Sequence, residues 1–245
     1  MALRTLLTVS CFVCGCSIKD IIFLNTTEGA SLLRSASHAA PFWQLSPHFL
    51  TELPGMCGPT SAIMVLNAFH SLGLPAAVSS MYSFHAGNYS EVWRYWDLKN
   101  IWNGSDARCI QEHTQPWLGS LEQVAAIIGC HGASAKAVEA SASSPAEFRN
   151  VLIEAFSHGR FVTTNFDRKK MNQEGFGHHS PIGAYDEDSD RVLVLDVARY
   201  KYPPWWADLN DMFAAMQSSA PFTNFTTPRG YIEASMPSEE SIFAA

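Results

Sequence analysis

Three residues far apart in the sequence have the chemical types that nucleophilic catalysis requires: a thiol at Cys57, an imidazole at His178 and a carboxylate at Asp196. A thiolate attacks a carbonyl carbon, an imidazole moves the proton, and a carboxylate fixes the tautomer and orientation of that imidazole. Each residue also has an ordinary structural interpretation, as a buried cysteine, a core histidine or a strand-end carboxylate. The segments that carry the three residues decide between these interpretations.

The segment around Cys57 predicts a nucleophile at the start of a helix. Residues 55–61 are small and turn-prone, and they run into the mostly apolar segment 62–69. Pro59 suits the first turn of a helix, where no intrahelical N–H donor is needed. Free N–H groups and the positive end of the helix dipole favour a thiolate at that point. We therefore expect a helix over residues 57–70 with the sulfur at its N-terminus.

Two strand-like runs, 176–185 and 191–199, flank a short charged turn and predict an antiparallel hairpin. With the turn centred on Glu187, His178 faces Asp196 across the two strands. A turn centred one residue later makes them diagonal neighbours, still within reach of an imidazole. The chain order of cysteine, histidine and acid is that of papain-type enzymes, in which the later partners follow the cysteine by roughly 130–150 residues.

Longer stretches around these residues closely resemble the phytochelatin synthase family. The matching stretches are Cys57-Gly58 with Val65-Leu66-Asn67-Ala68, Gly177-His178 with Ser180-Pro181-Ile182-Gly183, and Leu195-Asp196-Val197-Ala198-Arg199-Tyr200-Lys201-Tyr202-Pro203-Pro204. The last stretch is the most specific, and the similarity extends over residues 40–235. The resemblance implies an α+β, papain-like fold in which a helical lobe precedes an antiparallel sheet lobe.

The resemblance also implies a dipeptidyl transferase that acts on glutathione. By residue match, Cys57 is the nucleophile, His178 the base and Asp196 its orienting acid. Thiolate attack releases glycine and leaves a γ-glutamylcysteinyl thioester, which passes to water or to the amine of a second glutathione. The products are γ-glutamylcysteine or a phytochelatin. We expect no tightly bound cofactor and no metal-ligating residues, with Cd²⁺ and Zn²⁺ acting as activators or as metal–thiolate substrates.

Substrate binding is where this chain departs from the family pattern. Thr51 stands six residues before the nucleophile, where the family carries an oxyanion-hole glutamine, so we expect a weak oxyanion donor there. The acidic residue that the family places before its Arg-Gly-aromatic segment has no clear counterpart ahead of Arg229. Arg229 is expected to hold a substrate carboxylate, with Arg199 and Tyr202 as further substrate contacts. A structural ion pair is the equal alternative for Arg199.

The composition favours a globular enzyme with one catalytic domain over residues 40–235. Of 245 residues, 47% are apolar, which is enough for a papain-sized core. A net charge of −7 argues against a nucleic-acid partner, because phosphate binding needs a concentrated basic face. Helix signals at 57–70, 119–129 and 144–156 precede strand signals that begin at Phe161, in agreement with an α+β class.

The N-terminal segment 1–17 resembles a secretory signal, with Arg4 ahead of an apolar run and small residues after it. Residues 13–16 also resemble a bacterial lipobox, in which Cys16 would be lipidated. We therefore expect a secreted, periplasmic or membrane-anchored protein, with a leader or linker over 18–39 and a tail over 236–245. An apolar N-terminal element of a cytoplasmic protein is the alternative.

The remaining cysteines permit a disulfide between Cys109 and Cys130 in an oxidising compartment, while Cys57 stays free. Two separate buried thiols are the alternative for the pair. Spacing alone does not decide between them.

Three classes of function therefore remain open. The favoured one is an exported thiol acyltransferase or hydrolase for glutathione. The chain resembles short bacterial forms without the Cys-rich C-terminal extension, for which hydrolysis is the stronger expectation. The enzymatic rival is a papain-like peptidase for short peptides, although Arg199 and Arg229 favour a small acidic substrate. The non-enzymatic rival is a metal-binding or catalytically impaired relative, motivated by Thr51 and the missing acid. A homodimer is a further alternative to a monomer.

Overall fold

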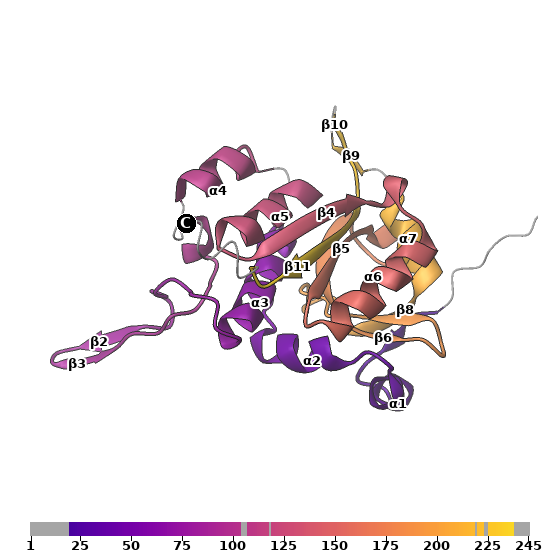
Figure 1. Ribbon diagram of the computed structural model, residues 1–245, viewed down its shortest axis with the longest axis horizontal. Coiled ribbons are helices and arrows are strands. Elements are labelled where there is room, and N and C mark those ends of the chain that lie inside the picture. The colour runs from indigo at the N-terminus through magenta and orange to yellow at the C-terminus, as the bar shows by residue number, and fades with distance from the viewer. Residues whose placement is uncertain (1–19, 104–106, 118, 219, 223–224, 238–245) are drawn as a thin grey trace, which may run out of the picture.

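An antiparallel sheet of seven strands, in the order β1-β8-β7-β6-β5-β11-β4, lies at the centre of the computed structural model (Figure 1). The structure describes residues 20–237, apart from 104–106, 118, 219 and 223–224. The strands of this sheet are β1 (Ile22–Phe23), β4 (Ser134–Glu139), β5 (Phe161–Asp167), β6 (Gly177–Asp186), β7 (Arg191–Val194), β8 (Trp205–Asp208) and β11 (Gly230–Ser235).

Helices cover both faces of the sheet (Figure 1). The helices are α1 (Thr27–Ser35), α2 (Ala40–Leu45), α3 (Cys57–Ser71), α4 (Ala107–Thr114), α5 (Leu121–Cys130), α6 (Pro145–Ser157) and α7 (Leu209–Met216). The face with α2, α3 and α5 and the face with α6 and α7 each form a separate apolar core. Alternate residues of a strand supply the two cores, because strand side chains point to opposite faces. Leu193 packs with the α3 side, whereas Val192 and Val194 pack with the α6 side.

The three predicted helices are confirmed, and their starts have local causes. α3 runs over Cys57–Ser71, close to the expected 57–70. α5 begins after Ser120, which forms a reciprocal capping box with Gln123. α6 begins after Ser144, whose hydroxyl accepts the N–H of Glu147, and it has a proline in its first turn. The α+β class is also confirmed. Two strands of the sheet, β1 and β4, precede the predicted onset of strands at Phe161.

The N-terminal part of the described chain is integrated into the sheet. Phe23 of β1 pairs with Trp205 of β8, and the indole of Trp206 donates to the carbonyl of Gly29 in α1 at 3.1 Å. His38 forms an antiparallel bridge with Tyr185 of β6. From residue 20 onward, the segment expected to be a leader or linker therefore belongs to the same packed unit as the rest of the chain.

The signal-like segment 1–17 and residues 238–245 of the expected tail lie outside the described residues. Within the described part of the chain, no helix is long and apolar enough to cross a membrane.

Three smaller features lie outside the sheet and its two helical layers. β2 (Phe84–Ala86) and β3 (Tyr89–Glu91) form a hairpin that projects from the body of the molecule (Figure 1). β9 (Ala220–Phe222) and β10 (Phe225–Thr227) form a second small hairpin just before β11. A disulfide joins Cys109 of α4 to Cys130 of α5, with their Cα atoms 5.7 Å apart. The pairing that the sequence left open is thus present.

Candidate active site

Cys57 is the first residue of α3, and it is half-buried and not disulfide-bonded. Among the described residues no side chain caps this helix, so its first backbone N–H groups are left for a negative charge at the sulfur. The next residue, Gly58, lets α3 approach α5 closely. A Cβ atom there would lie 2.6 Å from Cγ2 of Val124 and 3.4 Å from the ring of Trp117. Gly58 thus lets the N-terminal end of α3, which carries the thiol, pack closely against Val124 of α5.

His178 lies in β6, the middle strand of the sheet, and is almost fully buried. Its Nε2 atom is 2.9 Å from Oδ1 of Asp196, and Oγ of Ser180 lies 2.9 Å from the same nitrogen. Since Nε2 is held by the carboxylate, Nδ1 is the ring nitrogen left for the sulfur of Cys57. The two side chains that were expected to meet across the hairpin therefore do meet.

The register of this hairpin differs from the one centred on Glu187, whereas the pairing of Ile182 with Val194 agrees with the alternative centred one residue later. Asp186 faces Arg191, so the turn between β6 and β7 is centred later than Glu187. A β-bulge between Ile182 and Ala184 shifts the pairing again. Asp196 lies beyond the end of β7 and reaches His178 from there, rather than as a facing residue within the ladder.

Asp196 is completely buried, and four hydrogen bonds from three residues besides His178 hold it. Arg168 donates to both oxygens, from Nη1 to Oδ2 at 2.9 Å and from Nη2 to Oδ1 at 2.7 Å. The indole of Trp205 donates to Oδ2 at 2.9 Å, and the backbone N–H of Ala198 donates to Oδ1 at 2.9 Å. Burial raises the pKa of Asp196, but the hydrogen bonds and charges of His178 and Arg168 outweigh it and hold the pKa well below its usual range. The carboxylate is thus fixed in position and ionised.

The same surroundings favour a charged imidazole at His178. Burial lowers the pKa of His178, whereas its hydrogen bond to Asp196 and the neighbouring Cys57 raise it, and the net result is a raised pKa. A protonated imidazole beside a thiol stabilises the thiolate. The buried carboxylate therefore favours an imidazolium beside the sulfur of Cys57.

A fourth side chain, Glu52, completes the immediate surroundings of the sulfur. A carboxylate oxygen of Glu52, Sγ of Cys57 and a ring nitrogen of His178 all lie within 4.8 Å of one another. Glu52 is buried, its N–H donates to the carbonyl of Val197 at 2.9 Å, and its Oε1 accepts the hydroxyl of Tyr200 at 3.1 Å.

Thr51, the expected oxyanion donor, is exposed, and the side chain that approaches the nucleophile is that of its neighbour Glu52. Successive side chains of an extended segment point to opposite sides, so Glu52 points toward the sulfur while Thr51 points away from it. An ionised carboxylate accepts hydrogen bonds and does not donate them. The backbone N–H of Cys57 therefore remains as the donor that the helix start offers to an oxyanion.

The three residues expected to bind substrate have different surroundings. Arg199 is exposed, stacks on the ring of Phe49 at 4.7 Å and donates to the Phe49 carbonyl at 3.4 Å. Tyr202 accepts the backbone N–H of Glu174 through its hydroxyl at 2.8 Å, and its ring lies 5.1 Å from the guanidinium of Arg168. Tyr202 therefore supports the cation that holds Asp196.

Arg229 is buried beside the strand that carries His178. Its Nη1 donates to the carbonyl of Phe166 at 2.8 Å, and its Nε has no hydrogen-bond partner in the described part of the structure. A Cβ atom at Gly177 would lie 2.5 Å from Nη1, so this glycine makes room for the guanidinium next to His178. Burial lowers the pKa of Arg229.

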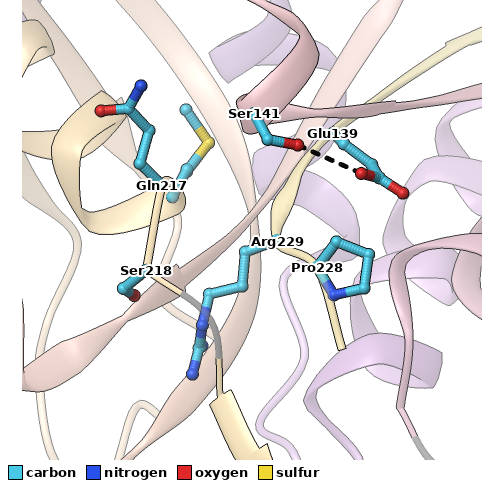
Figure 2. A pocket seen from close by; sticks show the side chains of 7 residues that line it. Glu139, Ser141, Gln217, Ser218, Pro228 and Arg229 are labelled. Atoms are coloured by element: carbon cyan, nitrogen blue, oxygen red, sulfur yellow. Dashed lines mark hydrogen bonds between the residues drawn. The ribbon is translucent and has the colours of Figure 1, made fainter. Parts of the chain in front are cut away.

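Arg229 also lines a pocket of about 330 Å³. The pocket is bounded by Glu139, Ser141, Met216, Gln217, Ser218, Pro228 and Arg229 (Figure 2). Figure 2 shows the guanidinium extending past Ser218 and away from Glu139, whose carboxylate accepts the hydroxyl of Ser141 at 3.1 Å. The pocket thus combines one cation and one acid on different walls.

Sequence reasoning missed several residues of this site. Arg168 lies in a charged turn after β5 and has no motif that separates it from a solvated lysine or arginine. Trp205 likewise has no motif that marks its indole as a donor to Asp196. Glu52 has no sequence pattern of its own, and only its closeness to Cys57 reveals it. Tyr200 lies in the matched stretch 195–204, but its hydrogen bond to Glu52 was not predicted.

Comparisons with known proteins agree with this geometry. A family model described as phytochelatin synthase matches residues 17–231. The chain is 31% identical over 196 residues to glutathione gamma-glutamylcysteinyltransferase 3 of Lotus japonicus, which is 78% of this chain and 36% of that protein. It is 30% identical over 225 residues to glutathione gamma-glutamylcysteinyltransferase 1 of Arabidopsis thaliana, which is 89% of this chain and 42% of that protein.

A third relative has the same printed name but matches a shorter part of the chain. The glutathione gamma-glutamylcysteinyltransferase of Schizosaccharomyces pombe is 33% identical over 114 residues, which is 46% of this chain and 27% of that protein. The chain spans less than half the length of these curated relatives. Since the family model covers most of the chain, the protein belongs to the phytochelatin synthase family.

Proposed function

We propose that this protein is a papain-like thiol acyltransferase that removes glycine from glutathione through a thioester on Cys57. The observation that carries the proposal is the assembly of Cys57, His178 and Asp196 across the first turn of α3 and the end of β7. The curated relatives named glutathione gamma-glutamylcysteinyltransferase support the substrate. The order of a helix carrying the cysteine before a sheet carrying the histidine and acid supports a papain-like arrangement.

The first half of the reaction follows from the charges of the site. The thiolate of Cys57 attacks the carbonyl carbon of the cysteinyl–glycine bond, and the backbone N–H at the helix start stabilises the developing oxyanion. The C–N bond breaks, and the imidazolium of His178 donates its proton to the departing glycine amine. Asp196 keeps the ring oriented with Nε2 toward itself and Nδ1 toward the sulfur.

The second half transfers the γ-glutamylcysteinyl group to an acceptor. His178, now neutral, removes a proton from water or from the amine of a second glutathione, and the acceptor displaces the sulfur. Water yields γ-glutamylcysteine and a second glutathione yields a phytochelatin. We propose hydrolysis as the main outcome. Cd²⁺ and Zn²⁺ enter as substrate, bound to the thiolate of glutathione.

Arg229 and Glu139 are proposed to recognise the γ-glutamyl end of the substrate. The pocket that they line joins a buried guanidinium to a carboxylate, which matches the carboxylate and the ammonium group of an amino acid. Arg229 is also adjacent to the strand segment Gly177–His178. Arg199 is proposed as a contact at the exposed rim.

The test is incubation of the purified full chain with glutathione, with and without Cd²⁺. Free glycine with γ-glutamylcysteine supports hydrolysis, and added γ-Glu-Cys oligomers support synthesis. A Cys57→Ala variant is expected to lose both products. Absence of glycine release from glutathione, together with cleavage of unrelated short peptides, would instead favour a papain-like peptidase. Persistent activity of Cys57→Ala would refute the nucleophile.

We further propose export of the protein to an oxidising compartment. The Cys109–Cys130 disulfide supports it, because such bonds persist in secreted proteins and are rare in the cytosol. The mass of the mature protein tests this proposal. Loss of the first 17 or so residues is expected, and an intact Met1 would contradict it.

A further inference from the structure

The sulfur of Cys57 lies among donor atoms of the kinds that bind zinc. A carboxylate oxygen of Glu52 and a ring nitrogen of His178 lie within 4.8 Å of it and of each other. Zinc binds thiolate, imidazole and carboxylate at about 2.0–2.3 Å, which places the donors roughly 3–4 Å apart. Small rotations of these side chains close the difference. Thiolate and imidazole also favour Cd²⁺ and Zn²⁺ over the hard ions Mg²⁺ and Ca²⁺.

The groups behind these donors hold them as the outer partners of a metal site do. Metal-binding histidines usually donate their second ring N–H to a carboxylate, and His178 has Asp196 at 2.9 Å for that purpose. The carboxylate of Glu52 accepts the hydroxyl of Tyr200 at 3.1 Å. One thiolate, one carboxylate and one neutral imidazole together balance the charge of a divalent cation. Because Cys57 is half-exposed, a fourth position stays open to water or to another ligand.

We propose that Glu52, Cys57 and His178 bind one Zn²⁺ or Cd²⁺ ion and that the bound ion blocks the nucleophile. On binding, the imidazolium proton of His178 leaves for solvent, and the thiolate sulfur and the freed ring nitrogen each donate a lone pair to the metal. A thioester sulfur is a poor ligand, so the ion binds the free protein and not the acylated one. Glu52 is the residue that makes this site, because it adds a carboxylate oxygen to the thiol and the imidazole.

If the protein has the proposed function, metal binding at this site affects how the rate of glutathione turnover depends on metal concentration. A cation already bound by glutathione enters as substrate, whereas an uncomplexed cation occupies Cys57 and competes with acylation. The rate should therefore rise while glutathione is in excess over metal and fall once free metal appears. Metal binding itself requires no turnover.

The experiment is a Co²⁺ titration of the full chain in which Cys11, Cys14 and Cys16 are changed to serine. With Cys109 and Cys130 in their disulfide, Cys57 is then the free thiol. We expect one equivalent of Co²⁺ to produce a near-ultraviolet thiolate-to-cobalt charge-transfer band, and Zn²⁺ to remove it by displacement. Cys57→Ser should abolish the band.

Two variants test the contribution of the Glu52 carboxylate and of its partner Tyr200 to metal binding. Glu52→Gln should weaken Co²⁺ and Zn²⁺ binding by about tenfold or more, and Tyr200→Phe by roughly 10- to 100-fold, as for other outer partners of metal ligands. Glu112→Gln, an exposed acid on α4, is the matched control and should bind like its parent. Circular dichroism confirms that each variant is folded. If Glu52→Gln misfolds, Tyr200→Phe carries the test.

Absence of the band, or unchanged affinity in both Glu52→Gln and Tyr200→Phe, would overturn the proposal. Binding in the complete absence of glutathione turnover would leave the metal site standing and refute the acyltransferase. Turnover of glutathione without metal binding would support the acyltransferase and refute the metal site. The two proposals therefore fail separately.

Discussion

At the scale of single residues, the site depends on a buried pair, Arg168 and Asp196, of which the sequence identified only the carboxylate. The guanidinium is 2% exposed and the carboxylate 0%. Neither charge has access to water, so each relies on the other, and the pair fixes the orientation of His178 through Oδ1. Such pairs add little net stability, but breaking one is costly because it leaves an uncompensated charge.

Replacement of Arg168 by leucine should therefore lower the free energy of unfolding by roughly 3–5 kcal/mol. Urea denaturation of Arg168→Leu measures the change. Lys170→Leu, an exposed substitution in the same short helix, should change stability by less than about 0.5 kcal/mol. Equal effects of the two substitutions would contradict a special role for the buried pair.

The lowered pKa of Asp196 predicts a dependence of stability on acid. A group whose native pKa is below its unfolded value, about 3.9 for aspartate, contributes stability that is complete above the unfolded pKa. That contribution is lost as the pH falls through the native pKa. We therefore expect the free energy of unfolding to fall below about pH 4, and to fall less steeply in Asp196→Asn.

The readout for this prediction is the slope of unfolding free energy against pH rather than its absolute value. Asp196→Asn is expected to be less stable overall, since Arg168 loses its counter-charge. Asp188→Asn removes an exposed carboxylate and should keep the parental slope. A parental slope in Asp196→Asn would mean that other carboxylates account for the acid sensitivity.

At the scale of elements, the position of the nucleophile depends on how closely α3 packs against α5. The Cβ atom of an alanine at residue 58 would lie 2.6 Å from Cγ2 of Val124, so one helix must shift. Gly58→Ala should cost about 1–3 kcal/mol of stability and reduce the acylation of Cys57. Adding Val124→Ala should restore part of the acylation rate, because it removes the clashing methyl group.

Gly129→Ala is the matched control for this packing argument. It lies in α5, and in the described part of the structure no atom outside its chain neighbours and the backbone of its own helix is within 4 Å of the position of an added Cβ. A glycine inside a helix with free space around it should gain roughly 0.4–1 kcal/mol on change to alanine. Thermal unfolding and active-site titration with a thiol reagent measure both variants. A neutral Gly58→Ala would show that α3 and α5 adjust without displacing the sulfur.

Local sequence patterns were sufficient for some elements and not for others. The helix at Cys57 and the caps at Ser120 and Ser144 depend on residues a few positions apart, so the chain predicts them well. The hairpin was predicted, but the register centred on Glu187 was wrong, and the alternative centred one residue later agrees with the pairing of Ile182 with Val194. The bulge before Ala184 and the late turn are determined by packing across the sheet, which a pattern of alternating residues does not record.

The same distinction applies to the candidate site. Cys57, His178 and Asp196 were identified from residue type, order and family resemblance, and the structure brings them together. Arg168 and Glu52 reach them only through tertiary folding. Thr51 illustrates the limit. Counting six residues back from the cysteine leads to Thr51, whereas the side chain that approaches the sulfur belongs to the next residue, Glu52.

At the scale of the whole molecule, the Cys109–Cys130 disulfide connects α4 to the end of α5, the helix against which α3 packs. The two cysteines are 21 residues apart in sequence. Closing a loop of that size stabilises a protein by about 3 kcal/mol through the unfolded chain. Changing both cysteines to alanine should lower the midpoint of thermal unfolding, and a reductant should lower that of the parent protein equally.

The control for this prediction is the double variant itself, which a reductant should not destabilise further. A midpoint that is the same with and without the cross-link would show that the packing of α4 on α5 is sufficient alone.

The pairing of β1 with β8 limits where the chain can be cut without loss of function. Phe23 pairs with Trp205, and the indole of Trp205 donates to Asp196. A protease that trims the N-terminus beyond residue 21 would remove the outermost strand and bare backbone groups next to that tryptophan. Any maturation of this protein must therefore stop before Ile22. A cleavage after residue 17 leaves β1 intact, whereas a cleavage a few peptide bonds later removes it.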